Sequence, residues 1–200
     1  MTLTSTTWKN KADFGRRVRG LTRGLWNDSI DFMSFINALT DVVFRGYEQA
    51  WREGASTCGI TSEERSADES RVLDRELQLA YGSMLGFADF IEAHKKVDGH
   101  LLRTNLNRAA IWTNRYSAIV TLAQSTSCAD RKFKWLLGGA IDHCSDCLGY
   151  HGRVHRGSVW ASVGAQPQST RLACHGYNCQ CRLELTNERA TPGRPARPTG

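Results

Sequence analysis

Five of the seven cysteines fall in the last third of the chain, and their spacing is that of two halves of one metal site. The first half is a Cys-x-x-Cys turn at Cys144 and Cys147, which can supply two thiolates from one tight loop. The second half is the cysteine-rich stretch from Cys174 to Cys181. Because Zn²⁺ prefers four soft or borderline ligands in a tetrahedron, the pattern predicts one structural zinc ion.

The chain offers more thiols than the four positions of such a site require. Cys179 and Cys181 are two residues apart, so on an extended strand both side chains point to the same side. Three nearby histidines, His143, His151 and His155, are candidates to hydrogen-bond the ligands. The expected ligands are Cys144, Cys147, Cys174 and Cys179, with Cys181 or His175 as the alternative for one of them.

Paired cysteines can also form a disulfide framework or a redox dithiol. The segment after Met1 lacks the apolar stretch of a secretory signal, so we expect a reducing compartment, where disulfides rarely persist. A redox dithiol needs its Cys-x-x-Cys at a helix start in a βαβ unit, and the three further cysteines nearby favour a metal. Cys58 and Cys128 stand apart from the others, and we interpret them as buried structural thiols.

The known motifs of zinc enzymes are missing from the sequence. A zinc deaminase needs His-x-Glu and Pro-Cys-x-x-Cys, and a metalloprotease needs His-Glu-x-x-His, but none of these occurs. An HNH-like nuclease stays open, because Asp142-His143, His175 and Asn178 supply its residue types, although in a different order. We expect a protein that is not an enzyme.

Long amphipathic segments precede the cysteines and must carry them. Apolar residues recur at helical spacing over residues 27–53, from Thr61 to about residue 98, and over residues 100–124. Gly54 is expected to stop the first helix, and Thr61 with Glu64 forms a capping box that is expected to start the second. Three such helices predict a bundle.

The residue pattern changes from helical to strand-like spacing after this helical part. Residues 132–137 and 181–185 alternate like strands, and glycines become frequent between them. So small a module buries little apolar surface, and a metal ion would supply stability. The predicted fold is mainly α: a long-helix bundle, then a small zinc-stapled β-rich C-terminal module and a disordered tail. The predicted parts are a basic N-terminal segment at 1–26, a helical body at 27–126, a zinc-binding module at 131–185 and a Pro-rich disordered tail at 186–200.

Positive charge is concentrated at the start of the chain. Residues 1–26 hold six basic side chains against Asp13 alone, within a net charge of +6 for the whole chain. Such a segment can bind nucleic-acid phosphates or an acidic protein surface, or it can be a solvated amphipathic helix. The apolar runs are too short to span a membrane, so we expect no membrane association.

The cysteine-rich part resembles the C-terminal signature of the phage minor head protein family (head morphogenesis, Mu F-like). The similarity covers about residues 131–185, and Tyr47 to Gly54 resembles the end of a helix that precedes the motif in that family. The family usually closes its motif with His-x-x-Cys-x-Cys, whereas here Cys174-His175 lies further from Cys179. The residues that carry the resemblance are Trp135, Asp142-His143-Cys144-Ser145-Asp146-Cys147, Gly149, Gly152, Pro167, Thr170, Cys174 and Asn178-Cys179-Gln180-Cys181-Arg182-Leu183.

The resemblance implies a non-catalytic virion component, placed at the portal vertex or the capsid interior after assembly in the host cytoplasm. Its implied partners are the portal or the major capsid protein, with packaged DNA as a possible contact of the basic N-terminal segment and a homo-oligomer as a further possibility. The implied role is head assembly or DNA packaging and delivery. The alternative is a zinc-containing nucleic-acid-binding protein, in which the basic segment joins a phosphate-facing surface made by Arg153, His155, Arg156 and Arg171.

Overall fold

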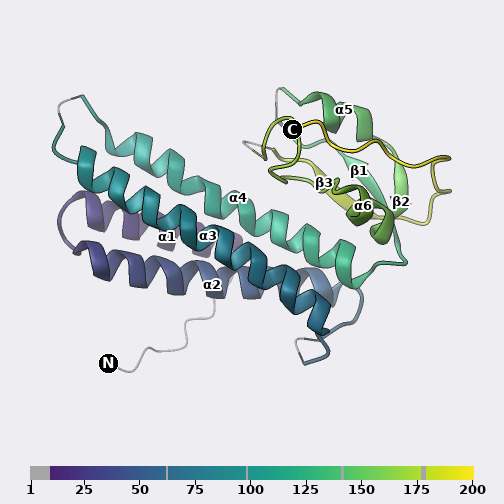
Figure 1. Cartoon of the computed structure of the whole chain (residues 1–200), viewed down its shortest axis with the longest axis horizontal. Helices are drawn as coiled ribbons and strands as arrows, with labels where there is room; N and C mark the ends of the chain where they lie inside the picture. Colours follow the sequence, from purple (N-terminus) through teal and green to yellow (C-terminus); the bar gives the residue numbers. More distant parts are fainter. Residues whose placement is uncertain (1–9, 62, 98, 141, 177–178) are drawn as a thin grey trace. The chain divides into compact units, whose positions relative to one another are not determined.

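The computed structural model describes residues 10–61, 63–97, 99–140, 142–176 and 179–200. Most of these residues are helical, and a small antiparallel sheet lies near the C-terminus (Figure 1), which confirms the predicted fold class at this level. No helix among the described residues has the length and apolar character needed to cross a membrane. The elements are α1 (Lys11–Trp26), α2 (Phe32–Ser56), α3 (Ala67–His94), α4 (Leu102–Ser127), β1 (Lys132–Leu136), α5 (Ser145–Tyr150), β2 (Val154–Arg156), α6 (Gly157–Val163) and β3 (Arg182–Leu185).

The chain forms two compact units, and three helices take part in both. The first unit combines the described part of Met1–Gln49 with Val72–Tyr116, and the second combines Ala50–Arg71 with Ser117–Gly200. The predicted division into a helical body and a later module therefore remains a prediction, because each unit is assembled from separate stretches of chain. We name them the helical unit and the cysteine unit.

The basic segment contains a helix of the helical unit. Asn10 caps α1 by accepting hydrogen bonds from the backbone N–H groups of Ala12 and Asp13, at 3.0 and 3.1 Å. One side of α1 buries Phe14, Val18 and other apolar residues, whereas its four arginines are exposed. Of the two interpretations of the segment, the amphipathic helix is therefore present in residues 11–26, and its exposed face still carries the charge.

Aromatic side chains hold the helices of this unit together. The ring centroids of Phe14 on α1 and Tyr116 on α4 are 5.6 Å apart, which joins the first and last helices. Phe87 on α3 packs 6.3 Å from Phe35 on α2 and 5.1 Å from Trp112 on α4. These buried contacts between distant stretches of chain produce the predicted bundle, with α1 as an additional helix.

Two helix starts differ from the prediction. Residues 27–31 connect α1 to α2 and are not helical, because Asn27 is the C-terminal cap of α1 and Asp31 accepts a 2.9 Å bond from the Ser34 N–H. Thr61 does bond to Glu64, but only as a turn, and α3 begins six residues later. There Ser66 and Glu69 form the capping box. The Ser66 N–H donates to the Glu69 carboxylate, and the Glu69 N–H donates to the Ser66 hydroxyl oxygen.

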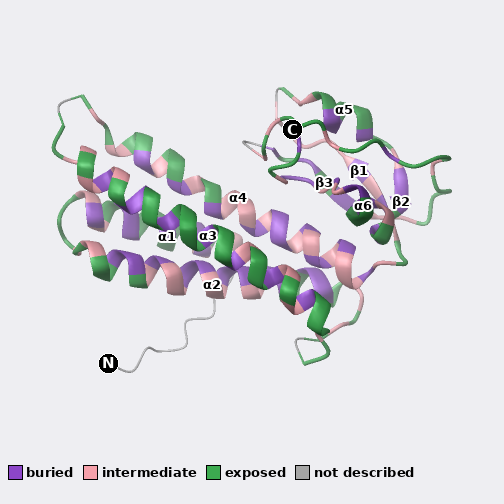
Figure 2. Cartoon of the chain, viewed as in Figure 1, coloured by how far each residue is buried: buried purple, intermediate pink, exposed green. Residues whose placement is uncertain are grey.

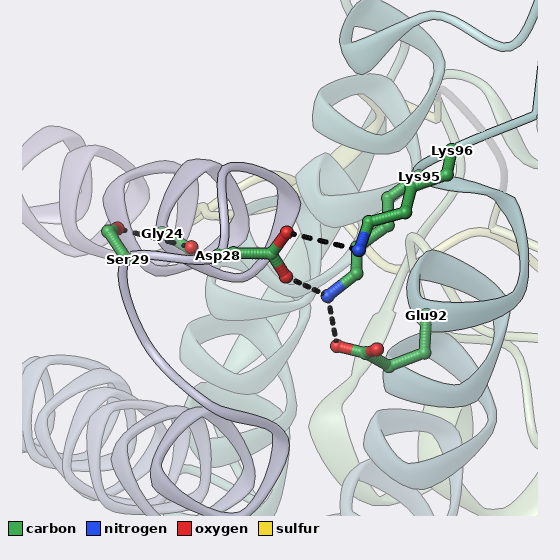
Figure 3. A network of polar contacts seen from close by, with 6 residues as sticks. All are labelled: Gly24, Asp28, Ser29, Glu92, Lys95 and Lys96. Atoms are coloured by element: carbon green, nitrogen blue, oxygen red, sulfur yellow. Dashed lines mark hydrogen bonds and ion pairs between the residues drawn. The ribbon is translucent and has the colours of Figure 1, made fainter.

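An ion network links the residues that follow α1 to those that follow α3 (Figure 3). Asp28 accepts a hydrogen bond from Lys95 and lies 3.7 Å from Lys96, and Lys95 also bonds to Glu92 at 2.9 Å. The hydrogen bond from Lys95 lowers the pKa of Asp28, and the same bond raises the pKa of Lys95. Asp28 and Lys96 face solvent, whereas the Lys95 side chain is only 9% exposed, so the Lys95 bonds are the better shielded part of the network.

Gly54 does not stop α2, as the sequence suggested, but lies inside it. A β-carbon at this position would come within 2.3 Å of the Val120 carbonyl oxygen on α4. Glycine is therefore required because two helix backbones meet here, both within the cysteine unit.

The interpretation of Cys58 and Cys128 as separate thiols is wrong. The structure joins them in a disulfide whose Cα atoms are 5.7 Å apart, between the residues that follow α2 and those that follow α4. The two cysteines are 70 residues apart in the sequence, so they could not be paired from spacing alone. They meet because the ends of α2 and α4 lie together.

The sheet of the cysteine unit has the strand order β2-β1-β3, with both pairs antiparallel. The central strand buries Phe133 and Trp135, and α6 contributes Trp160, whose indole N–H donates a 3.2 Å bond to the Phe133 carbonyl oxygen. Trp135, Tyr150 and Trp160 pack with centroid distances of 4.9 to 5.6 Å. These aromatic side chains form the core of the module.

The tail was expected to be disordered, and this expectation is wrong for the described residues 186–200. Thr191 exchanges two hydrogen bonds with Val154 of β2, and the Tyr150 hydroxyl donates a 2.9 Å bond to the Ala196 carbonyl oxygen. Pro195 is buried. Composition indicated disorder because the segment is almost free of apolar residues, but its backbone is held by partners that the module provides.

Candidate metal centre

The cysteines are carried by three short pieces of the cysteine unit. Cys144 is the N-cap of α5 and Cys147 lies in its first turn, where the Leu148 N–H donates a 3.0 Å bond to the Cys144 carbonyl oxygen. Cys174 lies in the loop between α6 and β3, and Cys181 directly precedes β3. The helix start and the strand start thus bring the two predicted half-sites together.

The sulfur atoms form two groups that share one member. Those of Cys144, Cys147 and Cys174 lie within 4.8 Å of one another, and those of Cys147, Cys179 and Cys181 do so as well. The Cys147 and Cys179 sulfurs are 3.9 Å apart. Four thiolates around zinc lie about 3.8 Å from one another, because each Zn–S bond is about 2.3 Å long. The cluster could therefore hold a metal ion, and Cys147 is its central member.

A cavity of about 430 Å³ opens onto these sulfurs. Cys147, Cys179 and Cys181 are buried, whereas Cys144 and Cys174 are half-buried. One side of the site is thus closed by protein and the other is open to an entering ion. The residues that line the cavity are Gly139, Ala140, Asp142, His143, Cys144, Cys147, Cys174, Cys179, Gln180 and Cys181.

The sulfurs strongly affect each other's ionisation. Hydrogen bonds from Cys147 and Cys179 lower the pKa of Cys181 to about 3, while the neighbouring Cys179 sulfur is the main cause of a raised pKa at Cys147. Burial raises the pKa of Cys174 to about 12. The thiols therefore ionise as one coupled group, and a bound cation would favour their thiolate forms.

Asp146 connects the two half-sites although the sequence did not single it out. It lies between the first two cysteines and is only 7% exposed. Its Oδ2 atom accepts a 2.7 Å bond from the N–H of Ala173, the neighbour of Cys174, and Thr199 of the tail donates 3.2 Å bonds from its N–H and its hydroxyl. One carboxylate thus fixes the helix that carries Cys147, the loop that carries Cys174, and the tail.

A close backbone contact positions the last two cysteines. A β-carbon on Gly138 would lie 2.2 Å from the carbonyl oxygen of Gln180, the residue between Cys179 and Cys181. Any larger residue at position 138 would push that segment away. The glycine therefore allows the chain after β1 to lie directly against the second half-site.

The histidines lie differently from what the sequence suggested. His175, the proposed alternative ligand, is exposed, and its Nδ1 atom lies 3.1 Å from the Thr170 carbonyl oxygen; it does not line the cavity. His143 does line it, with Nδ1 3.9 Å from the Cys181 sulfur. His151 accepts a 3.4 Å bond from the Leu137 N–H. Among the described histidines, His143 is thus the one beside the cysteines.

The surface proposed for nucleic-acid phosphates is incomplete. His155 is buried against the edge of Trp160, and burial lowers its pKa. Arg156 is exposed and lies 3.4 Å from Asp130, and Arg171 is exposed as well. Asn178, named above for the nuclease alternative, lies outside the described residues.

Comparisons of the chain with protein-family models, curated proteins and solved structures found no match.

Proposed function

We propose that the cysteine cluster binds one structural zinc ion, and that the chain is a structural minor head protein of a tailed phage. The observation that carries the first part is the convergence of five cysteines from three chain segments around Cys147. Thiolates are soft ligands and favour zinc over magnesium or calcium. A site whose four positions are all filled by protein has no place for a substrate, which favours a structural role over catalysis.

The second part rests on the resemblance of residues 131–185 to the head morphogenesis family. A long helical part followed by a metal-stapled module suits a component that contacts portal or capsid protein. The exposed arginines of α1 suit a contact with packaged DNA, because clustered charge binds phosphates without a shaped pocket. We therefore propose a location at the portal vertex or the capsid interior, and a role in head assembly or DNA packaging and delivery.

The metal is tested first on the purified chain by mass spectrometry of its elemental content. We expect about one zinc per chain in the wild type, and its loss in Cys147→Ser, because this sulfur belongs to both groups. The matched control is Cys58→Ser, which removes a cysteine outside the cluster and should leave zinc content unchanged. Full zinc content in Cys147→Ser would refute the site.

The role in heads is tested by a protein inventory of particles purified from the source, together with co-purification of portal or shell proteins. Presence in particles supports the proposal. Zinc binding without any particle association would point to the nucleic-acid-binding alternative. That alternative requires DNA affinity that falls steeply with salt concentration.

A further inference from the structure

Two exposed leucines lie on the outer side of α3, one on each flank of the exposed Gly82. Leu79 is 55% exposed and Leu85 is 37% exposed. Part of this exposed face is visible on α3 in Figure 2. Isolated exposed leucines are ordinary, but here they lie within two turns of one helix that buries most of its other apolar residues.

Charged residues flank this face symmetrically. Arg75 lies seven residues before Gly82 and Asp89 lies seven residues after it, and all three are exposed. Neither charged residue forms an ion pair within the described residues, unlike Arg71, which pairs with Asp68 one turn earlier. Seven residues are two helical turns, so the two charges and Gly82 fall on the same side of the helix.

We propose that α3 binds α3 of a second copy of this chain, antiparallel, about a two-fold axis that passes Gly82. In such a pair, a residue at a given distance before Gly82 faces the residue at the same distance after it on the partner. Arg75 of each chain therefore meets Asp89 of the other. The pattern is self-complementary, which argues for a second copy over an unrelated protein.

The apolar residues fit the same arrangement. Leu79 lies three residues before Gly82 and Gly86 lies four after it, both on the same flank of the stripe, so each leucine packs over a glycine of the partner. A β-carbon on Gly82 or Gly86 would meet nothing within 4 Å in the single chain, so the surface above both is open. The contact extends from Arg75 to Asp89, about 21 Å of helix.

The contact is smaller than a standard protein interface, so the dimer is weak and depends on concentration. Its exposed ion pairs are screened by salt, and association should weaken as ionic strength rises. The inference goes beyond the proposed role in heads and does not rest on it, because it uses only residues of α3.

Analytical ultracentrifugation of the full-length chain over a wide concentration range tests the proposal. We expect reversible dimerisation of the wild type and a dissociation constant at least about tenfold higher in Arg75→Asp, which places two aspartates opposite each other in both pairs. The double variant Arg75→Asp with Asp89→Arg exchanges the charges and should restore the wild-type constant. The matched control is Arg103→Asp, the same charge change at an exposed position of α4.

A second pair of variants separates association from folding. Gly82→Glu places two like charges at the axis and should abolish the dimer, while the better helix former raises the melting temperature of the monomer. Gly20→Glu makes the same change at an exposed glycine of α1, where a β-carbon also meets nothing, and should leave association unchanged. A wild type that is monomeric at every concentration, or a double variant as weak as Arg75→Asp, would overturn the proposal.

Discussion

The helical unit and the cysteine unit differ in the size of their apolar cores and in the contacts that supplement them. In the helical unit, long helices bury aromatic and aliphatic side chains, and Phe87 alone contacts aromatic rings on two other helices. In the cysteine unit, strands of three to five residues enclose a smaller aromatic core, and a cysteine cluster, a disulfide after α2 and α4, and a hydrogen-bonded tail surround it. We therefore expect the smaller core to depend more on its few specific bonds than the long helices do.

Removal of the proposed zinc ion should give the largest difference in stability between the two units. A structural zinc site contributes on the order of 10 kcal/mol to the folding of a small module. We expect a chelator, or Cys147→Ser, to abolish the near-UV circular dichroism of Trp135 and Trp160 while most far-UV helix signal remains. Equal loss of both signals would contradict the division of stability.

A cavity in the helical unit should lower the unfolding free energy by less than loss of zinc does, and it should destabilise the helical unit first. Phe87→Ala should cost about 3 to 5 kcal/mol of unfolding free energy, because a buried aromatic ring leaves a void between three helices. Zinc content should stay unchanged. Ile111→Ala, at a side chain that is 53% exposed on α4, is the control and should change little when both are compared by urea unfolding.

Opening the Cys58–Cys128 disulfide should weaken the cysteine unit next. Closing a loop of about 70 residues limits the unfolded chain, and such bonds typically contribute about 2 to 4 kcal/mol. We expect Cys128→Ser to lower the melting temperature. A thiol assay on the denatured, metal-free wild type should find five reactive thiols; seven would show that the bond is absent in solution.

Asp146→Asn should have the smallest effect on stability, and we expect its main effect to be a lower affinity for the metal. The carboxylate accepts bonds from both Ala173 and Thr199, so its charge holds the loop of Cys174 in place. Partners of metal ligands typically contribute a factor of about 10 to 100 in affinity, which a competing chelator can measure. Asp130→Asn, at a position that is 92% exposed, is the matched control; equal affinity in both variants would remove the assigned role.

Much of the helical unit could be predicted because its pattern is local. Apolar residues at helical spacing indicated α2, α3 and α4 without knowledge of their partners. The start of α3 was placed too early because Thr61 and Glu64 have the same residue types as Ser66 and Glu69, and only the second pair lies where the helix begins. α1 was masked by its charge, although Phe14 and Val18 already showed its apolar side.

The sequence alone determined the presence of the three long helices, two of the strands (β1 and β3) and the two cysteine half-sites, because spacing of three to four residues or two residues has a direct geometric meaning. Only the tertiary structure decided that Cys58 meets Cys128, that His143 and not His175 lies beside the cysteines, and that Asp146 joins three segments. It also decided that the tail forms hydrogen bonds with Tyr150 and Val154. Each of these depends on which distant segments meet, and that is set by packing of the whole chain, which a local pattern does not contain.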